Sequence, residues 1–261
     1  MSEFGLHLTY IGGPTALLEV GGLRLLTDPT FDPGGSEYRT PVYVLRKTQG
    51  PALAPEAVGA VDVVLLSHDH HFDNLDHAGR RLLATAARVL TTTAGAGRLG
   101  GNAVGLAPGQ SHAVSTRNGR LLRITATPAR HGPPDGDRGP VIGFVLAFAD
   151  HPEQVVYVSG DTVWYDAIAE VGRRFTPDVA VLFAVAARVR EVGPAHLTLT
   201  AAEAVTAAQA FPAALIVPLH FEGWAHFSES RGEIEHAFAA AGLAHRLRWP
   251  VPGQALDLSR T

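Results

Sequence analysis

Histidines and aspartates are concentrated in residues 68–76, directly after an apolar segment at residues 61–66. The apolar segment is typical of a largely buried strand, and the rigid end of a strand can hold side chains in the geometry that a metal ion requires. In an extended chain His68 and His70 would share one face, and a turn into a helix would bring Asp73 beside His70. We therefore interpret the cluster as metal ligands rather than as a polar helix start with solvated histidines. Its six titratable members are His68, Asp69, His70, His71, Asp73 and Asp76.

The same residue types recur where later apolar segments end. A lone histidine is more often a packed or solvated residue, but the same ligand types at four separate strand ends indicate one shared metal site. Imidazole and carboxylate ligands without any thiolate suit zinc, manganese or iron(II). We expect one or two divalent metal ions, with zinc as the first choice. The later candidates are His131 after residues 121–127, Asp161 after residues 155–158, and His220 after residues 215–219.

Composition excludes several other chemistries. The chain has 261 residues and no cysteine, which rules out disulfides, thiol nucleophiles, zinc fingers and cysteine-ligated clusters. Its net charge of −4 is unfavourable for a protein held by nucleic-acid phosphates, so we expect a small-molecule substrate and no nucleic-acid partner. The sequence contains neither a P-loop nor a dinucleotide-binding glycine pattern.

The balance of residue types is that of a folded chain, because 46% of the residues are hydrophobic and 18% are charged. We see no signal-peptide pattern and no apolar run approaching the roughly 18 residues of a membrane-spanning helix. We therefore expect a cytoplasmic enzyme without a membrane span. At this length a single α/β domain over residues 1–261 is the first expectation, and assembly into a homo-oligomer stays open.

Runs of short strands, with helices interspersed in each half, indicate the architecture. Residues 6–11, 15–20 and 23–27 are separated by glycine-containing turns, which predicts an antiparallel meander. Residues 29–55 are expected to be a long loop or lid. The pattern favours a layered α/β sandwich of two sheets over a doubly wound sheet. Further strands are expected at residues 61–66, 88–92, 103–106, 112–115, 121–127, 141–148, 154–158, 178–183, 215–219 and 243–249, and helices at residues 74–87, 164–175, 200–210 (after a capping box) and 230–242.

Together these motifs resemble the metallo-β-lactamase superfamily, and most of all its branch with the N-acyl phosphatidylethanolamine phospholipase D and ascorbate-phosphate lactonase enzymes. The resemblance covers nearly the whole chain, and its segments occur in the family's order. It implies an α/β fold that is a four-layer αβ/βα sandwich of two mixed β-sheets flanked by helices, with metals at one edge between the sheets. The segments are residues 10–19 (opening strand pair), 26–29 (next strand), 67–76 (metal loop), and 125–133, 159–162 and 218–220 (later ligand motifs).

The metal loop departs from the family's HxHxDH pattern. Asp73 comes one place late, as if one residue were inserted after His68. On that alignment His71 takes the position of the second histidine, and Asn74 replaces the final one. Gly13 is a second departure, because the branch often has a histidine there, so a group near the site would be missing.

The altered loop leaves two arrangements open. In the first, one metal is bound by His68, His131 and one of the two histidines at positions 70 and 71. Asp73 then serves the second metal, together with Asn74 or the other histidine of the pair. In the second arrangement, the second site is weak and the enzyme works with one metal.

The resemblance also implies that Asp161 bridges the two metals and that His220 completes the second site. A bound metal lowers the pKa of its water toward ~7 and polarises a carbonyl or phosphoryl oxygen. Asp73 is then a candidate catalytic residue that orients the nucleophile or moves its proton, or it is simply a ligand. Asp28 would accept a hydrogen bond from a ligand histidine, or serve only as a turn residue before Pro29.

These features predict a metal-dependent hydrolase that cleaves an ester-like bond in a phosphodiester, a phosphate ester or a lactone. The alternative is a degenerate member of the fold that acts as a binding or scaffold protein without catalytic metal, which the altered loop and Gly13 would favour. The retained ligands at positions 131, 161 and 220 favour the enzyme instead. A redox-active di-iron relative is a third hypothesis.

The pocket wall is predicted from the segments around residues 193–198 and 220–227. The early loop at residues 32–55 is expected to decide specificity together with residues 220–227. We expect substrate contacts from His196, Glu222, Trp224 and His226, with Trp224 alternatively in the core and the two histidines alternatively solvated. The cations at positions 39, 46 and 47 would either hold a phosphate or carboxylate of the substrate or, as we favour, solvate a loop.

Overall fold

The first sheet comes from the N-terminal half of the chain and is closed by one C-terminal strand. The structure is a computed structural model that describes residues 5–259. In order across this sheet the strands are β15 (Ala255–Asp257), β1 (Leu6–Gly12), β2 (Thr15–Val20), β3 (Leu23–Thr27), β6 (Val63–Leu65), β7 (Arg88–Thr92) and β8 (Ala103–Leu106). The expected meander is confirmed, because β1, β2 and β3 pair antiparallel. From β3 to β8 the neighbours run parallel.

The second sheet comes from the C-terminal half and is also mixed. In order its strands are β14 (Leu215–Leu219), β13 (Val179–Phe183), β12 (His151–Val158), β11 (Ile142–Phe148), β10 (Leu121–Pro128) and β9 (Ser111–Ser115). The strands from β9 to β12 pair antiparallel, whereas β12, β13 and β14 are parallel.

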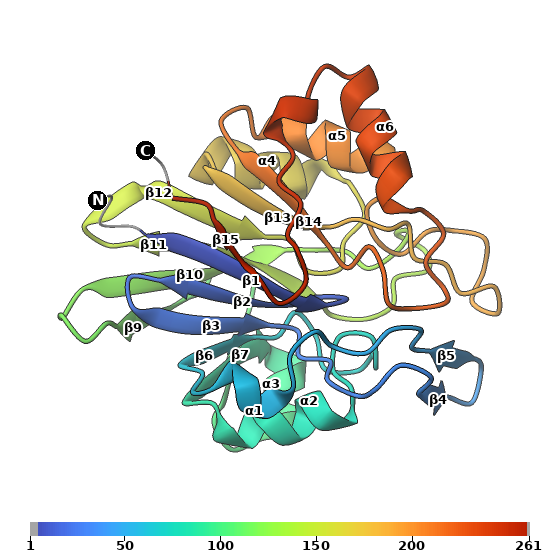
Figure 1. The fold of residues 1–261 in the computed structure, drawn as a ribbon, viewed down its shortest axis with the longest axis horizontal. Helices are drawn as coiled ribbons and strands as arrows, with labels where there is room; N and C mark the ends of the chain where they lie inside the picture. Colours follow the sequence, from blue (N-terminus) through green and yellow to red (C-terminus); the bar gives the residue numbers. More distant parts are fainter. Residues whose placement is uncertain (1–4, 260–261) are drawn as a thin grey trace.

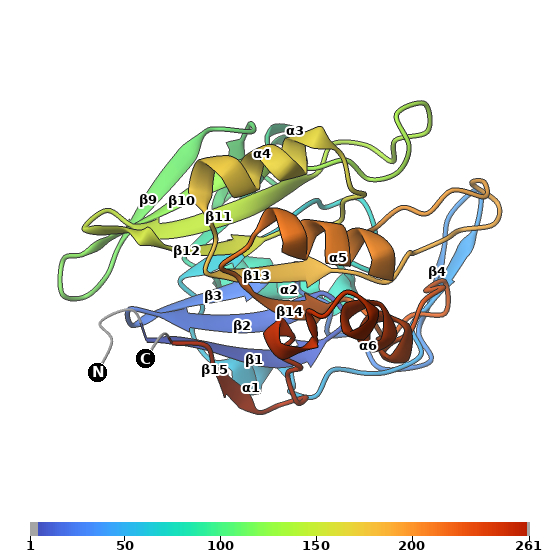
Figure 2. The ribbon, with the colours of Figure 1, turned by 90° about the horizontal axis from the view of Figure 1, so that it is seen from above.

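Helices cover the outer face of each sheet, as Figure 1 and Figure 2 show. The first sheet carries α1 (Pro55–Val58), α2 (His77–Leu82) and α3 (Thr93–Leu99), and the second carries α4 (Asp166–Phe175), α5 (Ala201–Ala210) and α6 (Arg231–Ala240). The expected four-layer αβ/βα sandwich is therefore confirmed. Within residues 5–259, no helix combines the length and the apolar character needed to cross a membrane.

The strand period explains how one sheet can contact two layers. Leu18 and Leu25 belong to the large apolar cluster between the sheets, while their chain neighbours Leu17 and Leu26 belong to the cluster under α2. Since successive side chains of a strand point to opposite faces, both faces of the first sheet are buried. This burial holds the strand ends in fixed positions.

Two expected elements differ in the structure. Residues 243–249 are not a strand but contain a short 3₁₀ helix, η2 (Ala244–Arg246), and the closing strand is β15 instead. The Arg246 guanidinium is buried and donates hydrogen bonds to the carbonyls of Ala208 and Ala214, which holds this segment as a turn. The helix expected at residues 74–87 is shorter: α2 is followed by η1 (Leu83–Thr85).

The expected long loop at residues 29–55 contains a hairpin. Strands β4 (Glu37–Arg39) and β5 (Val44–Arg46) pair antiparallel and lie at one end of the molecule, apart from the two sheets (Figure 1). Arg39 and Arg46 are exposed and pair with Glu37, so these two cations lie on the outside of the hairpin.

Candidate metal centre

The ends of four strands bring the candidate ligands together at one edge of the sandwich. Each of these residues is at most 3% exposed, so the candidate centre is buried among its supporting elements. The candidates are His68 after β6, His131 after β10, Asp161 after β12 and His220 after β14.

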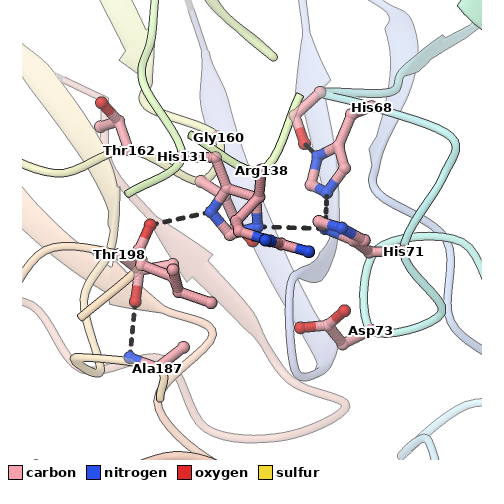
Figure 3. Close-up of polar contacts among 12 residues, drawn as sticks. His68, His71, Asp73, His131, Arg138, Gly160, Thr162, Ala187 and Thr198 are labelled. Carbon is pink, nitrogen blue, oxygen red and sulfur yellow. Dashed lines mark hydrogen bonds and ion pairs between the residues drawn. The ribbon is translucent and has the colours of Figure 1, made fainter. Parts of the chain in front are cut away.

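Three histidines converge in the first half of the centre (Figure 3). Nδ1 of His71 lies 3.0 Å from Nε2 of His68 and 3.1 Å from Nε2 of His131. Nδ1–H of His131 donates to the carbonyl of Leu197 at 2.8 Å, which leaves its Nε2 free to bind a metal. Burial, and then the neighbouring imidazoles, hold the pKa of His68 and His71 well below the ordinary value. Burial also lowers the pKa of His131 to about 4. Neutral imidazole is the form that binds metal.

The two adjacent histidines in the loop have different neighbours. His71 points between His68 and His131, whereas Nε2–H of His70 donates to the carbonyl of Arg138 at 2.8 Å. His70 still lies close enough to form a possible ligand group with His68 and His71. Its hydrogen bond nevertheless directs this nitrogen toward the loop that carries Arg138.

Asp73, Asp161 and His220 form the second half of the centre, with ligand atoms within 4.8 Å of one another. Nε2 of His220 lies 3.6 Å from Oδ2 of Asp73 and 3.8 Å from Oδ1 of Asp161. The other oxygen of Asp161 lies 3.6 Å from Nε2 of His131, so this carboxylate faces both halves. Burial raises the pKa of Asp161 well above its ordinary value. Burial alone would also raise the pKa of Asp73, but the neighbouring imidazoles of His220 and His226 hold it well below that value.

The donor set and its unpaired atoms fit a metal. Within the described residues, neither oxygen of Asp161 and neither ring nitrogen of His220 has a hydrogen-bond partner. Buried polar atoms without partners are costly, and a metal ion would satisfy them. Asn74, at the position of the family's last loop histidine, is fully buried, and its side-chain amide also has no hydrogen-bond partner among residues 5–259.

Asp28 supports the first half of the centre through one intervening residue. Its carboxylate accepts hydrogen bonds from the backbone N–H and hydroxyl of Ser67, at 2.7 and 2.9 Å. The Ser67 hydroxyl in turn lies 2.9 Å from Nδ1 of His68. Asp28 thus contacts the ligand histidine indirectly. Asp28 and His220 both have positive φ, at 23° and 58°, a strained backbone that clusters at functional sites.

The four residues expected to contact substrate are divided by the structure. His226 lines the pocket beside the centre, and its Nε2 lies 3.0 Å from Oδ2 of Asp73. The other three are not among the residues that line this pocket. Nε2 of His196 lies 3.1 Å from the Glu203 carboxylate, Glu222 lies beside the Tyr10 hydroxyl, and Trp224 is 4% exposed and packs on Tyr38.

Trp224 accounts for the glycine at position 13. A Cβ on Gly13 would lie 3.1 Å from the indole nitrogen of Trp224, and the φ of Gly13 is +55°. Only glycine adopts this conformation readily, and the indole fills the space that a side chain would need. The backbone carbonyl of Gly13 accepts a hydrogen bond from the N–H of His220 at 2.8 Å. Gly13 therefore supports the site through its backbone.

Several pocket residues were not singled out individually in the sequence, although two of them lie in the early loop at residues 32–55. Tyr43 and Leu45 come from the hairpin, Arg138 from the loop after His131, and Val189 from the segment after β13. No periodic pattern marks them, since all lie in or beside loops. Proximity to His131 was the only signal that could have found Arg138.

Lys47 follows β5 and is buried rather than exposed. Its Nζ lies 3.0 Å from Oδ2 of Asp76, with the two side chains 4% and 0% exposed. Asp76 also accepts a hydrogen bond from the N–H of Gly79 and so caps α2. The pair joins the hairpin to the helix that follows the metal loop, a role different from the two expected for this cation.

Comparison with known proteins agrees with this geometry. The model of the family described as Beta-lactamase superfamily domain matches residues 23–221. A UPF0173 metal-dependent hydrolase of Caldivirga maquilingensis is 24% identical over 256 residues, which cover 97% of this chain and 98% of that protein.

Solved structures show the same fold. A possible metal-dependent hydrolase from Veillonella parvula has a TM-score of 0.83 at 17% identity, over 97% of this chain and 99% of the other. The isothiocyanate hydrolase from Delia radicum gut bacteria has a TM-score of 0.78 at 23% identity, over 96% and 98%. The predicted resemblance is confirmed by the family match, and the chain belongs to the beta-lactamase superfamily.

Proposed function

We propose that the protein is a metal-dependent hydrolase that holds two divalent ions at the edge between its sheets. His68, His71 and His131 bind the first ion, because their nitrogens converge at 3.0–3.1 Å. Asp73 and His220 bind the second. Asp161 would be shared by the two ions, since its oxygens face His131 on one side and His220 on the other. Zinc suits this set of imidazoles and carboxylates, with manganese and iron(II) as the other suitable metals.

The observation that carries the proposal is the environment of Asp161. This carboxylate is 0% exposed, and within residues 5–259 neither of its oxygens has a hydrogen-bond partner. A buried carboxylate is strongly unfavourable unless it is paired or coordinates a metal. The imidazole nitrogens of His131 and His220 lie 3.6 and 3.8 Å from its two oxygens, so a metal between these groups is the partner that the site supports.

The chain's own residues supply orientation. When bound, the ions lower the pKa of a water toward ~7 and polarise the bond to be cleaved. Asp73 keeps its negative charge beside the two imidazoles of His220 and His226. Its carboxylate can therefore accept a hydrogen bond from the nucleophilic water and fix the orientation of that water. Leu197 and Ser67 fix the rings of His131 and His68 from behind.

The bond cleaved is ester-like, in a phosphodiester, a phosphate ester or a lactone. The support for hydrolysis is the ligand set, together with relatives that are named metal-dependent hydrolases. Isothiocyanates belong in the same substrate screen, because one structural neighbour is named for their hydrolysis. We expect a small-molecule substrate, because the pocket beside the centre is lined by candidate ligands on one side and by apolar side chains on the other.

Metal content tests the proposal. Mass spectrometry of the protein purified without added metal should find about two ions per chain, and Asp161→Ala should lose them. Asp257→Ala is the matched control, since it removes an aspartate that is 66% exposed and lies outside the centre. About one ion would show that the altered loop has weakened the second site. No uptake, even after zinc or manganese is added, would refute the hydrolase and favour the binding or scaffold alternative.

A further inference from the structure

Arg138 is placed to act on whatever enters the pocket beside the candidate centre. It lines that pocket together with His71, Asp73 and His131, and among the described lining residues it is the only arginine or lysine. In Figure 3 its side chain extends past His131 toward His71. A strongly basic group therefore lies beside the candidate ligands without being one of them.

The backbone of Arg138 is held at both ends by the candidate centre. Its N–H donates to the carbonyl of His131 at 2.9 Å, and its own carbonyl accepts from Nε2 of His70 at 2.8 Å. A Cβ at the next residue, Gly139, would lie 2.9 Å from that same nitrogen, so the two segments touch. The base of the Arg138 side chain is thus positioned by the residues that surround the metal loop.

The positive charge of Arg138 is not neutralised by the protein. Across residues 5–259, no carboxylate lies within ion-pair distance of its guanidinium, whereas Arg98 on the other side of the metal loop pairs with Asp69. Burial is the main reason that the pKa of His71 is lowered, and the positive charge of Arg138 makes a smaller contribution in the same direction. The field of Arg138 therefore reaches the centre. A planar guanidinium without a partner is suited to carboxylate or phosphate oxygens, which it can bind in pairs.

The rest of the pocket wall is mainly apolar. Leu45 comes from the hairpin, and Val189, Val192 and Leu197 come from the segment after β13, while Tyr43 adds a phenol. These side chains offer a non-polar surface to the part of a ligand that points away from the metals. The pocket therefore combines one cation with a short apolar wall.

We propose that Arg138 binds an anionic group of the substrate, so that the substrate is a small anion, a carboxylate or a phosphate, with a short apolar part. This inference rests on the proposed function, because it names the substrate class of the same site. Arg138 contacts the substrate and leaves the metals to the ligands already described. Loss of its charge-assisted hydrogen bonds should weaken anion binding by about 10- to 100-fold.

Calorimetric titration of the zinc-loaded protein with inorganic phosphate and with butyrate tests the inference. Arg138→Ala should weaken binding of one or both anions, and Arg138→Lys should recover part of the loss, because it keeps the charge but not the planar fork. Arg190→Ala is the matched control: it removes the same charge from an exposed position on the neighbouring segment, outside the pocket lining. Loss for phosphate alone, or for butyrate alone, identifies which anion the site takes.

Hydrolysis of paired 4-nitrophenyl substrates gives a second measurement. Arg138→Ala should raise KM for the anionic bis(4-nitrophenyl) phosphate and leave KM for the neutral 4-nitrophenyl butyrate unchanged. Unaltered binding of both anions in Arg138→Ala would overturn the inference, as would an equal loss in Arg190→Ala. Metal analysis of each variant distinguishes the two proposals. If the wild-type protein takes up zinc and Arg138→Ala still binds anions normally, only the role of Arg138 is refuted. Wild-type protein that takes up no zinc refutes the proposed function.

Discussion

The buried ion pair of Lys47 and Asp76 allows a quantitative test of how the hairpin is attached beside the candidate centre. Lys47→Met would leave the Asp76 carboxylate, which is 0% exposed, with two remaining donors: the backbone N–H groups of Asp32 at 2.7 Å and Gly79 at 2.8 Å. Removing one partner of a buried pair costs about 3–5 kcal/mol. Because two donors remain, we expect a loss near the lower end, about 3 kcal/mol in the free energy of unfolding.

A double-mutant cycle isolates the pair itself. Asp76→Asn keeps an oxygen for the N–H of Gly79 but places a neutral amide opposite the buried ammonium of Lys47, so it should also be strongly destabilising. The double variant buries no unpaired charge, and we expect it to recover about 2 kcal/mol relative to the sum of the single changes. Glu235→Ala is the control, because it breaks a pair with Arg231 of 2.8 Å whose side chains are 53% and 45% exposed. An exposed pair is worth at most about 1 kcal/mol.

Urea unfolding followed by circular dichroism measures these differences by linear extrapolation. The protein should be metal-free, because bound metal would add stability that depends on its concentration. A Lys47→Met variant no less stable than Glu235→Ala, or single losses that simply add in the double variant, would refute the reasoning.

Three further predictions concern the centre and its support. Burial lowers the pKa of His131 to about 4, below the ordinary value near 6.5, so the folded state favours the neutral ring. The contribution of this ring to stability is therefore present above about pH 6.5 and is lost as the pH falls toward 4. Between pH 7.5 and 5 the loss in free energy of unfolding from this ring should be about 2 kcal/mol. Urea unfolding of the metal-free wild type and of His131→Phe measures it as a difference in pH dependence, and equal pH dependence in the two proteins would contradict the prediction. His226→Ala removes the imidazole that lies 3.0 Å from Asp73. Chelator competition should show that the second ion is bound about 10- to 100-fold more weakly and the first ion as before, and His245→Ala at an exposed position is the control. Gly79→Ala in α2 should lower the free energy of unfolding by several kcal/mol, because its Cβ would lie 1.8 Å from the carbonyl oxygen of Pro29. Gly97→Ala in α3 meets nothing within 4 Å and should raise it by about 0.5–1 kcal/mol. Similar effects of the two variants in thermal or urea unfolding would contradict this packing.

Local patterns in the sequence predicted most of the fold. Short β-rich runs between glycine turns mark the meander of β1, β2 and β3, and apolar runs mark the buried strands of both sheets. The strand predicted at residues 243–249 was wrong, and local patterns do not contain the reason. Its apolar residues pack beside Arg246, whose buried guanidinium needs the carbonyls of residues 208–214, more than thirty positions away.

The candidate ligands were also visible in the sequence, because each follows an apolar strand and only histidine and aspartate recur there. Which of them face one another is a question of tertiary structure. Only the folded loop turns His71 toward His68 and His131 and turns His70 toward Arg138.

Contacts between distant segments decide the rest of the site. His226 meets Asp73 across 153 positions, and Trp224 fills the space over Gly13. Residue type and spacing determined the chemistry and the layers, since both depend on neighbours along the chain. The shape of the pocket, the charge left on Arg138 and the burial of Lys47 depend on how loops from both sheets pack against one another, and only the tertiary structure decides that.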